Sequence, residues 1–264
     1  SFPTRRSSDL QQFCPASPPE AVSAMAAAWR FNPAARVETV RLDDGSEVHV
    51  VDDFVEDPES LVALAQSAAA RFEAPAGHPY PGPQLDLPPA MTAALEAHFQ
   101  QHFRARLGAG LPQGSYARFS RVTQAAGALD ARQRICHRDD SGLDPRDMVC
   151  AAVHYLFRDA ALGGTVFFRS RMSDEDTQQF MRDANTLAAA AFGDKYGIPP
   201  GYMTESNRYF EVIGRVAARW NRAVFYNGGI FHSGDIRWAE PAAYVQGPGR
   251  LTINAFFKSR RPHA

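Results

Sequence analysis

The chain has 264 residues, 45% of them hydrophobic, which is enough for one large domain with a buried core. Its formal net charge of -1 provides no general basic field to hold a nucleic acid. No apolar run reaches the roughly 18 to 20 residues that cross a bilayer, and the three cysteines, Cys14, Cys136 and Cys150, indicate no disulfide framework. We therefore expect a protein of the reducing cytoplasm that binds neither nucleic acid nor membrane.

The first residues, SFPTRRSSDL, lack the apolar segment of a signal peptide. They resemble the translation of a common sequencing adapter, so residues 1–24 are predicted to be a disordered and artefactual leader, with a natural start at Met25. Alanine is abundant, and Lys195 and Lys258 are the only lysines. This composition indicates GC-rich coding DNA and hence a bacterial source.

The N-terminal part of the chain is predicted to hold a hairpin and two helices. Residues 36–54 alternate around Asp44–Gly45, which is typical of a turn between two strands. Residues 57–72 carry acidic groups and an early proline ahead of apolar residues at helical spacing. Residues 73–89 are too rich in proline and glycine for regular structure, so they are predicted to be a loop. A second helix is expected at about 90–107.

The rest of the chain is predicted to be rich in strands. Apolar and alternating runs predict strands at 115–123, 148–157, 163–170, 209–218, 221–229 and 249–259. Between them, residues 173–196 read as one helix, because Ser173 can cap it, acids fill its first turn and Gly197 lies just beyond its end.

This order of elements predicts a mainly β fold with flanking helices, of the α+β class. Residues 25–264 are expected to form a single domain, with a helical N-terminal part over 25–110 and a β-rich core over 111–264. Antiparallel strands that enclose a pocket favour a jelly-roll or cupin-type barrel, with the helix at 173–196 as an insertion.

Two histidines and an aspartate form a candidate metal site. In an extended chain, His137 and Asp139 of the CHRDD stretch point to one face, while Cys136 and Arg138 point to the other. His232 follows a strand and a glycine turn in GGIFHSGD. Two histidines and one carboxylate on one side of a metal leave positions open on the other side, as in the facial triad of non-haem Fe(II) oxygenases.

An arginine begins the last predicted strand, in the run RLTINAFF. An arginine fork near the end of a pocket can hold a dicarboxylate through paired hydrogen bonds, which suits arginine better than lysine. Arg250 is therefore a candidate for binding such a co-substrate.

From about Ser115 onward the sequence resembles the Fe(II)/2-oxoglutarate-dependent dioxygenase superfamily, nearest its prolyl-4-hydroxylase-like branch. The motifs HRD, GGTVFF, FHSG and GRLTINAFF stand in the order of that family, and the closest likeness is to a bacterial group without an assigned substrate. The gap between His137 and His232 is long for the superfamily, and the helical insertion at 173–196 accounts for it.

The resemblance implies a double-stranded β-helix core and a site that uses Fe(II) and 2-oxoglutarate. It implies His137, Asp139 and His232 as iron ligands and catalytic residues, and Arg250 as the partner of the distal carboxylate of 2-oxoglutarate. The activity it implies is hydroxylation of a small molecule or a protein side chain, with release of succinate and carbon dioxide. The substrate and the oligomeric state stay open at this point.

Two other interpretations of the HRD stretch are less favoured. A kinase catalytic loop needs an Asn five places after the aspartate, where this chain has Asp144, and there is no glycine-rich loop or DFG motif. Asp140 is a second candidate carboxylate, but on an extended chain it faces away from His137. Its expected role is to influence the hydrogen bonds around the site.

Further residues are weaker candidates. Thr252 shares a strand face with Arg250 and is a candidate contact for 2-oxoglutarate, and Asn254 shares that face too. Tyr155 can contact 2-oxoglutarate or pack in the core, whereas His154 points to the opposite face and is expected to be structural. Residues 167–169 are either core or substrate-facing, and Cys136 is expected to be a packed thiol.

Two rival functions remain open. A cupin-like metalloprotein or metalloenzyme would keep the metal site and not use 2-oxoglutarate, so it would not depend on Arg250. A non-catalytic binding module would keep the barrel alone, and the complete triad argues against it.

Overall fold

The computed structural model describes residues 29–74, 79–238 and 249–262, and within them the chain forms two antiparallel sheets. The predicted leader at 1–24 and the start at Met25 lie outside the described residues. The larger sheet has seven strands, in the order β1 (Val37–Arg41), β2 (Glu47–Val51), β8 (Ala223–Asn227), β5 (Asp147–Tyr155), β10 (Arg250–Arg260), β4 (Pro112–Val122) and β3 (Gln84–Asp86). The smaller sheet has three strands, in the order β7 (Phe210–Val216), β6 (Thr165–Ser170) and β9 (Phe231–Gly234).

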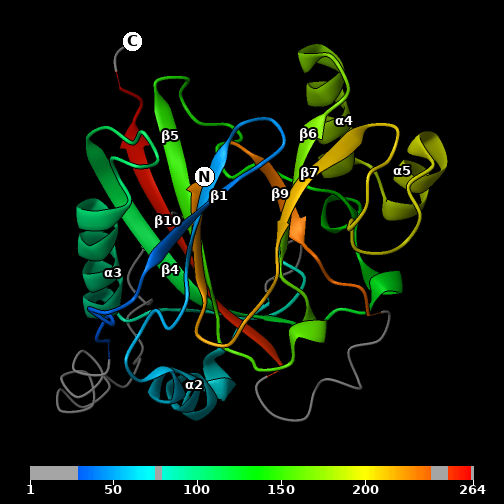
Figure 1. Cartoon of the computed structure of the whole chain (residues 1–264). Helices are drawn as coiled ribbons and strands as arrows, with labels where there is room; N and C mark the ends of the chain where they lie inside the picture. The colour runs from blue at the N-terminus through cyan, green and yellow to red at the C-terminus, as the bar shows by residue number, and fades with distance from the viewer. Residues whose placement is uncertain (1–28, 75–78, 239–248, 263–264) are drawn as a thin grey trace, which may run out of the picture.

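Four α-helices flank these sheets in the described part of the chain. They are α2 (Pro58–Ser67), α3 (Pro89–His102), α4 (Asp174–Thr186) and α5 (Ala189–Tyr196), with short 3-10 turns at η1 (Ala69–Arg71), η2 (Ala126–Ala128), η3 (Arg132–Arg134) and η4 (Ala160–Leu162). Helix α3 lies beside the larger sheet, whereas α4 and α5 lie on the side of the smaller sheet (Figure 1). None of the helices in the described residues is long and apolar enough to cross a membrane.

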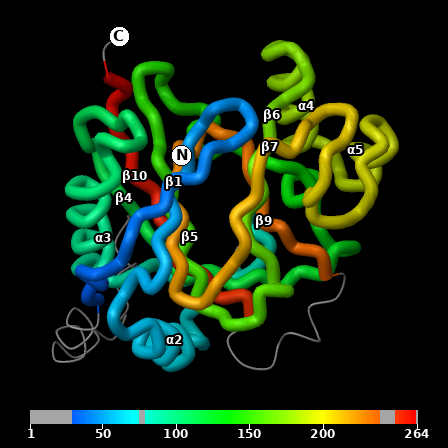
Figure 2. Tube along the Cα trace, viewed as in Figure 1, coloured from blue at the N-terminus to red at the C-terminus, as the bar shows by residue number. Residues whose placement is uncertain are grey.

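Strand β10 runs through the middle of the larger sheet between β5 and β4, as the red trace in Figure 2 shows. Its side chains alternate. Leu251, Ile253 and Phe257 belong to the core cluster that includes residues of α3, while Arg250 and Asn254 line a cavity on the opposite face. The period of two in the sequence therefore assigns one face of β10 to the core and the other to the cavity.

The predicted hairpin and first two helices are confirmed. The turn at Gly45 has φ +85°, and β1 pairs with β2 in register across it. The Asp57 side chain caps α2 by accepting a hydrogen bond from the Ser60 backbone nitrogen at 3.1 Å. Helix α3 ends at His102, five residues before the predicted end. The predicted N-terminal part thus adds three strands to the larger sheet as well as two helices.

The prediction that 73–89 lacks regular structure was wrong at its end. Residues 84–86 form β3, which pairs with β4 from Ser120 to Arg118. These residues lie between Pro83 and Pro88 and include no proline, so their backbone N–H groups are available for a strand ladder.

The predicted single helix at 173–196 was also wrong, because α4 and α5 are separated at Leu187 and Ala188, both in extended backbone. The break lets α5 fold back, so that Phe192 meets Phe180 edge to face at 5.2 Å between ring centroids. In one straight helix the twelve-residue separation would hold these rings about 18 Å apart along the axis. The predicted cap at Ser173 is confirmed, and Gly197 ends α5 with φ +64°.

Candidate metal centre

The segment that carries His137 docks as a short strand against β9. His137 and His232 exchange both backbone hydrogen bonds, with N–O distances of 3.0 and 2.9 Å. Two residues on, the Asp139 backbone nitrogen donates to the Gly228 carbonyl at 2.8 Å. These backbone contacts hold the two parts of the predicted site together before any side chain is considered.

Gly228 allows this close approach. A Cβ at position 228 would lie 2.9 Å from the Asp139 side chain and 3.0 Å from the Val149 carbonyl oxygen. A larger residue would therefore push the Asp139 carboxylate away.

The three predicted ligand side chains converge on one point. The His137 Nε2 lies 3.6 Å from Asp139 Oδ1, and the His232 Nε2 lies 3.5 Å from Asp139 Oδ2. One ligand atom from each residue lies within 4.8 Å of the others. Ligands at about 2.1 Å from a shared ion stand roughly 3 Å apart, so these spacings are close to those of a metal site. Asp139 Oδ2 is buried and has no hydrogen-bond partner, which fits a carboxylate intended for a metal.

Hydrogen bonding sets the tautomer of His232. Its Nδ1 lies 2.9 Å from the Ile230 carbonyl oxygen, which can only accept, so Nδ1 carries the proton. The Nε2 lone pair is then directed at Asp139 and the shared point. Burial lowers the pKa of His232 to about 4, which keeps the ring neutral, as metal ligation requires.

The carboxylate is destabilised in the absence of a cation. The pKa of Asp139 is raised to about 6, chiefly by burial; the charge of His137 lowers it and the nearby charge of Asp140 raises it. Desolvation, and less strongly the charge of His232, lower the pKa of His137 to about 4, while the charge of Asp139 raises it. The His137 side chain is 53% exposed and lines the cavity. A divalent cation would reverse the effect on Asp139.

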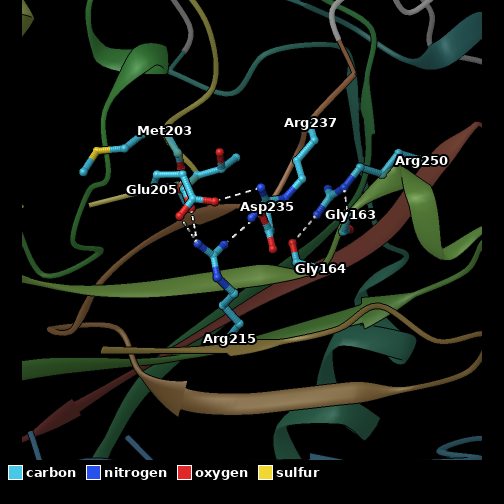
Figure 3. Close-up of polar contacts among 10 residues, drawn as sticks. Gly163, Gly164, Met203, Glu205, Arg215, Asp235, Arg237 and Arg250 are labelled. Carbon is cyan, nitrogen blue, oxygen red and sulfur yellow. Dashed lines mark hydrogen bonds and ion pairs between the residues drawn. The ribbon is translucent and has the colours of Figure 1, made fainter. Parts of the chain in front are cut away.

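Arg250 is held at the start of β10 by two backbone carbonyls. Its Nε donates to Gly163 at 3.2 Å and its Nη2 to Gly164 at 3.1 Å (Figure 3). Gly163 has φ +92°, and a Cβ there would meet the Asp235 carbonyl at 2.1 Å, so only glycine fits this turn. Arg250 is 6% exposed, and no carboxylate of the described residues forms an ion pair with it. A buried and unbalanced guanidinium favours binding of an anion.

The triad and Arg250 line one cavity of about 440 Å³. Its floor includes inward-facing residues of β4, β5 and β10, and its other walls include residues of β6, β9 and α4. The site is therefore built between the two sheets, where residues distant in sequence converge.

The sequence matches the family of unknown function DUF6445 over residues 33–257, a range that includes the triad and Arg250. The chain belongs to the DUF6445 family. Comparison of this DUF6445 chain with curated proteins found no match.

Comparison with solved structures found weak likenesses. A Pseudomonas putida prolyl-4-hydroxylase is 14% identical, with 81% of this chain and 88% of that one covered and a TM-score of 0.39. HygX from Streptomyces hygroscopicus, with nickel and 2-oxoglutarate bound, is 14% identical over 84% of this chain and 85% of that one, with a TM-score of 0.42. EvdO2 from Micromonospora carbonacea var. aurantiaca, complexed with 2-oxoglutarate, is 13% identical over 87% of this chain and 95% of that one, also with a TM-score of 0.42. Likenesses of this degree carry no conclusion about the reaction of the DUF6445 protein.

Two predicted contacts for the co-substrate lie beneath the cavity wall. Tyr155 is fully buried, and its hydroxyl shares a 2.7 Å hydrogen bond with Thr165, which does line the cavity. Thr252 is also fully buried, next to the Tyr80 hydroxyl. Neither Tyr155 nor Thr252 is among the described lining residues, so their predicted role would need the wall to rearrange.

Other sequence predictions can be placed as well. Asp140 pairs with Arg261 at 3.2 Å and does not line the metal cavity. His154 is buried on the α3 side of the sheet, with its Nε2 3.0 Å from Asn221 Oδ1. Cys136 is a fully buried free thiol. Residues 167–169 do not line the described cavity walls.

Two tyrosines near Arg250 were missed by the sequence analysis. Tyr80, between two prolines of the predicted loop, is partly buried, with its hydroxyl beside Arg250, Thr252 and Ser120, and desolvation raises its pKa. Tyr202 also lines the cavity and donates from its hydroxyl to the Gln124 carbonyl at 2.8 Å. Neither residue lies on a periodic pattern, so no sequence signal distinguished them from other loop aromatics.

A cluster of ion pairs holds the segment that follows α5 against β7 and β9 (Figure 3). Arg215 lies 3.0 Å from Asp235 and 2.9 Å from Glu205. Arg237 reaches the same two carboxylates at 3.1 and 2.8 Å. Met203, which precedes this cluster and lines the cavity, is held to β9 by its carbonyl, which accepts a hydrogen bond from the Ser233 hydroxyl at 2.6 Å.

Proposed function

We propose that the protein is an Fe(II)- and 2-oxoglutarate-dependent oxygenase that hydroxylates an organic substrate. One observation carries the proposal: a cavity lined by two histidines and a carboxylate oxygen without a hydrogen bond also contains a buried arginine that no carboxylate of the described residues balances. A divalent metal would balance the carboxylate, and an organic anion would balance the arginine. The two facing sheets would then form the double-stranded β-helix core expected from the sequence.

In this proposal His137, Asp139 and His232 bind the metal from one side. His232 offers Nε2 because its Nδ1 donates to Ile230, and Asp139 offers Oδ2, which accepts no hydrogen bond from the described part of the chain. The His137 side chain is half exposed and lines the cavity, so a metal bound there would be accessible from the cavity. Two-histidine, one-carboxylate sites with open positions favour non-haem Fe(II).

Arg250 binds the distal carboxylate of 2-oxoglutarate. Two of its N–H groups are engaged by the Gly163 and Gly164 carbonyls, which fix the guanidinium and leave its other donors for a carboxylate. The Tyr80 hydroxyl beside it can add one more hydrogen bond. Removing water from this end of the cavity strengthens both interactions.

When bound, Fe(II) and 2-oxoglutarate supply oxidative chemistry, in which 2-oxoglutarate and dioxygen yield succinate, carbon dioxide and one oxygen atom for the substrate. The residues of the chain position these groups and exclude water. Thr165 and Tyr202 complete the wall between the metal and Arg250, and the 2.7 Å bond to Tyr155 holds the Thr165 hydroxyl in place.

The experiment that tests this proposal is anaerobic titration of the purified protein with Fe(II) and then 2-oxoglutarate. We expect a visible metal-to-ligand charge-transfer band that is absent in His137→Ala. Arg250→Gln should retain metal binding and lose most 2-oxoglutarate affinity, by about a hundredfold, because a charged, desolvated pair is removed. Arg146→Gln, an exposed arginine outside the cavity, is the matched control.

The rival is a cupin-like metalloprotein that does not use 2-oxoglutarate. If the protein is of that kind, it should bind the metal and show no charge-transfer band on addition of 2-oxoglutarate. Arg250→Gln and the wild type should then bind the metal equally well and should not differ in their response to 2-oxoglutarate. Absence of both the band and succinate formation would rule out the oxygenase.

A further inference from the structure

A second hollow adjoins the metal cavity. It has a volume of about 810 Å³ and lies between α4 and the segment that follows Asp139. Four residues line both hollows: Arg138, Ser141, Met181 and Asn185. The two hollows therefore adjoin along these residues, and we call the combined space the channel; the second hollow is larger than a metal ion and one small dicarboxylate require.

Helix α4 forms a fixed wall of this channel. Met181 and Asn185 lie four residues apart and so share one face of the helix. On another face, Phe180 is buried against aromatic residues of α5 and β7. Asp183 ties α4 to α5 through Lys195 at 2.6 Å. The wall is thus supported by packing and by an ion pair.

Arg138 stands where the two hollows meet. Its guanidinium lies over the Phe231 ring, with Cζ 4.9 Å from the centroid. Within the described residues it donates no hydrogen bond, and its only ion-pair partner, Asp140, is 3.7 Å away. Asp140 is instead hydrogen-bonded to Arg261 at 3.2 Å. The Arg138 charge is held in place by stacking, while its N–H edge stays available.

The charge of the channel favours an anionic ligand. Its described lining holds five arginines, at 118, 132, 138, 182 and 250, against two acids, Asp139 and Asp174. Asp139 faces the two histidines of the metal site. Arg118 and Arg132 are paired with Asp86 and Asp130, which lie outside this lining. The local positive charge is therefore carried by Arg138, Arg182 and Arg250, in a chain whose formal net charge is -1.

We infer that the channel binds an elongated substrate with an anionic end group, a carboxylate or a phosphate, and that Arg138 binds this group. The inference rests on the proposed oxygenase function and adds the class of its substrate. Because Arg138 lines both hollows, the anion would bind at their junction. The rest of the substrate would then extend along α4, past Met181.

The test uses the full protein and three probes with the same chain, hexanoate, hexyl phosphate and neutral hexanamide. The protein is first loaded anaerobically with Fe(II) and 2-oxoglutarate, and the charge-transfer band is recorded. Each probe is then titrated by calorimetry. We expect saturable binding at one site for at least one anion, about tenfold tighter than for hexanamide. The tighter of the two anions identifies the end group.

Variants assign the site. Arg138→Gln should weaken anion binding about tenfold. The affinity of Arg138→Lys should lie between those of Arg138→Gln and the wild type, and the affinity of Arg146→Gln should equal that of the wild type. Met181→Trp, which narrows the junction of the two hollows, should weaken the binding of hexanoate and hexyl phosphate. It should leave the binding of acetate, which lacks the long chain, unchanged. This second variant keeps the test decisive if Arg138→Gln does not fold.

Three results would overturn the inference: no saturable anion binding, equal binding of hexanamide and the anions, or unchanged binding in Arg138→Gln. Absence of the charge-transfer band at the loading step contradicts the proposed function alone. The anion titrations can then be run on the metal-free protein, where dependence on Arg138 still tests the site.

Discussion

His137 and His232 belong to distant parts of the chain, yet they exchange both backbone hydrogen bonds, at 3.0 and 2.9 Å. The two imidazoles therefore face each other with ring centroids 4.5 Å apart. Backbone pairing sets the geometry of the site, so residues that permit this pairing matter as much as the ligands.

Gly228→Ala tests that dependence. The added methyl would meet the Asp139 side chain at 2.9 Å and the Val149 carbonyl at 3.0 Å, so it should displace the carboxylate. We expect metal affinity to fall at least about tenfold, as measured by calorimetry with Fe(II) under anaerobic conditions. Gly127→Ala is the control, because its Cβ would meet nothing within 4 Å. Equal affinity in the two variants would show that the site tolerates the methyl group.

Metal affinity should depend on pH through Asp139. Its pKa in the metal-free protein is raised to about 6 by burial, while burial lowers the pKa of His232 to about 4. Below pH 6 a metal must displace the proton of the carboxyl group, so affinity should fall about tenfold per pH unit between pH 6 and 4. Above pH 6 the carboxylate is already ionised and the affinity should level off. A profile that keeps rising to pH 8 would point to a different titrating group.

Tyr155→Phe separates structure from co-substrate binding. The variant loses the 2.7 Å hydrogen bond to Thr165, and the free energy of unfolding should fall by about 1 kcal/mol in urea. The KM for 2-oxoglutarate should change less than about twofold. A large rise in KM with unchanged stability would instead support the direct contact that the sequence suggested.

His154 should make stability depend on pH. It is 2% exposed, and burial lowers its pKa in the folded state to about 4, against an ordinary value of 6.5 for histidine. As pH falls from 6.5 to 4, the unfolded chain takes up a proton that the folded protein does not, so stability is lost over that window. The loss from this residue should be roughly 3 kcal/mol.

The measurement for His154 compares urea unfolding of the wild type and His154→Gln from pH 7 to pH 4. Gln keeps a donor toward Asn221 but does not titrate. The variant should be less stable at pH 7 and less sensitive to acid. Parallel pH profiles for the two proteins would contradict a neutral buried imidazole.

Much of the fold could be predicted because its signals are local. Alternation places Arg250 and Asn254 on one face of β10, and the turn at Gly45, the cap at Ser173 and the end at Gly197 follow from single residues. The break between α4 and α5 was missed because it depends on Phe192 packing against Phe180, a contact that no local pattern encodes.

The sequence by itself determined which residue types lie at His137, Asp139, His232 and Arg250, and the strand period determined which faces they occupy. Only the tertiary structure decided which of these faces is open. Thr252 and Arg250 share one face, but neighbouring strands and Tyr80 cover Thr252, while Arg250 reaches the cavity. Arg138, which alternation directed away from the ligands, reaches both hollows because β9 and α4 fold around it. Exposure depends on segments distant in sequence, and their positions follow from packing rather than from a local pattern.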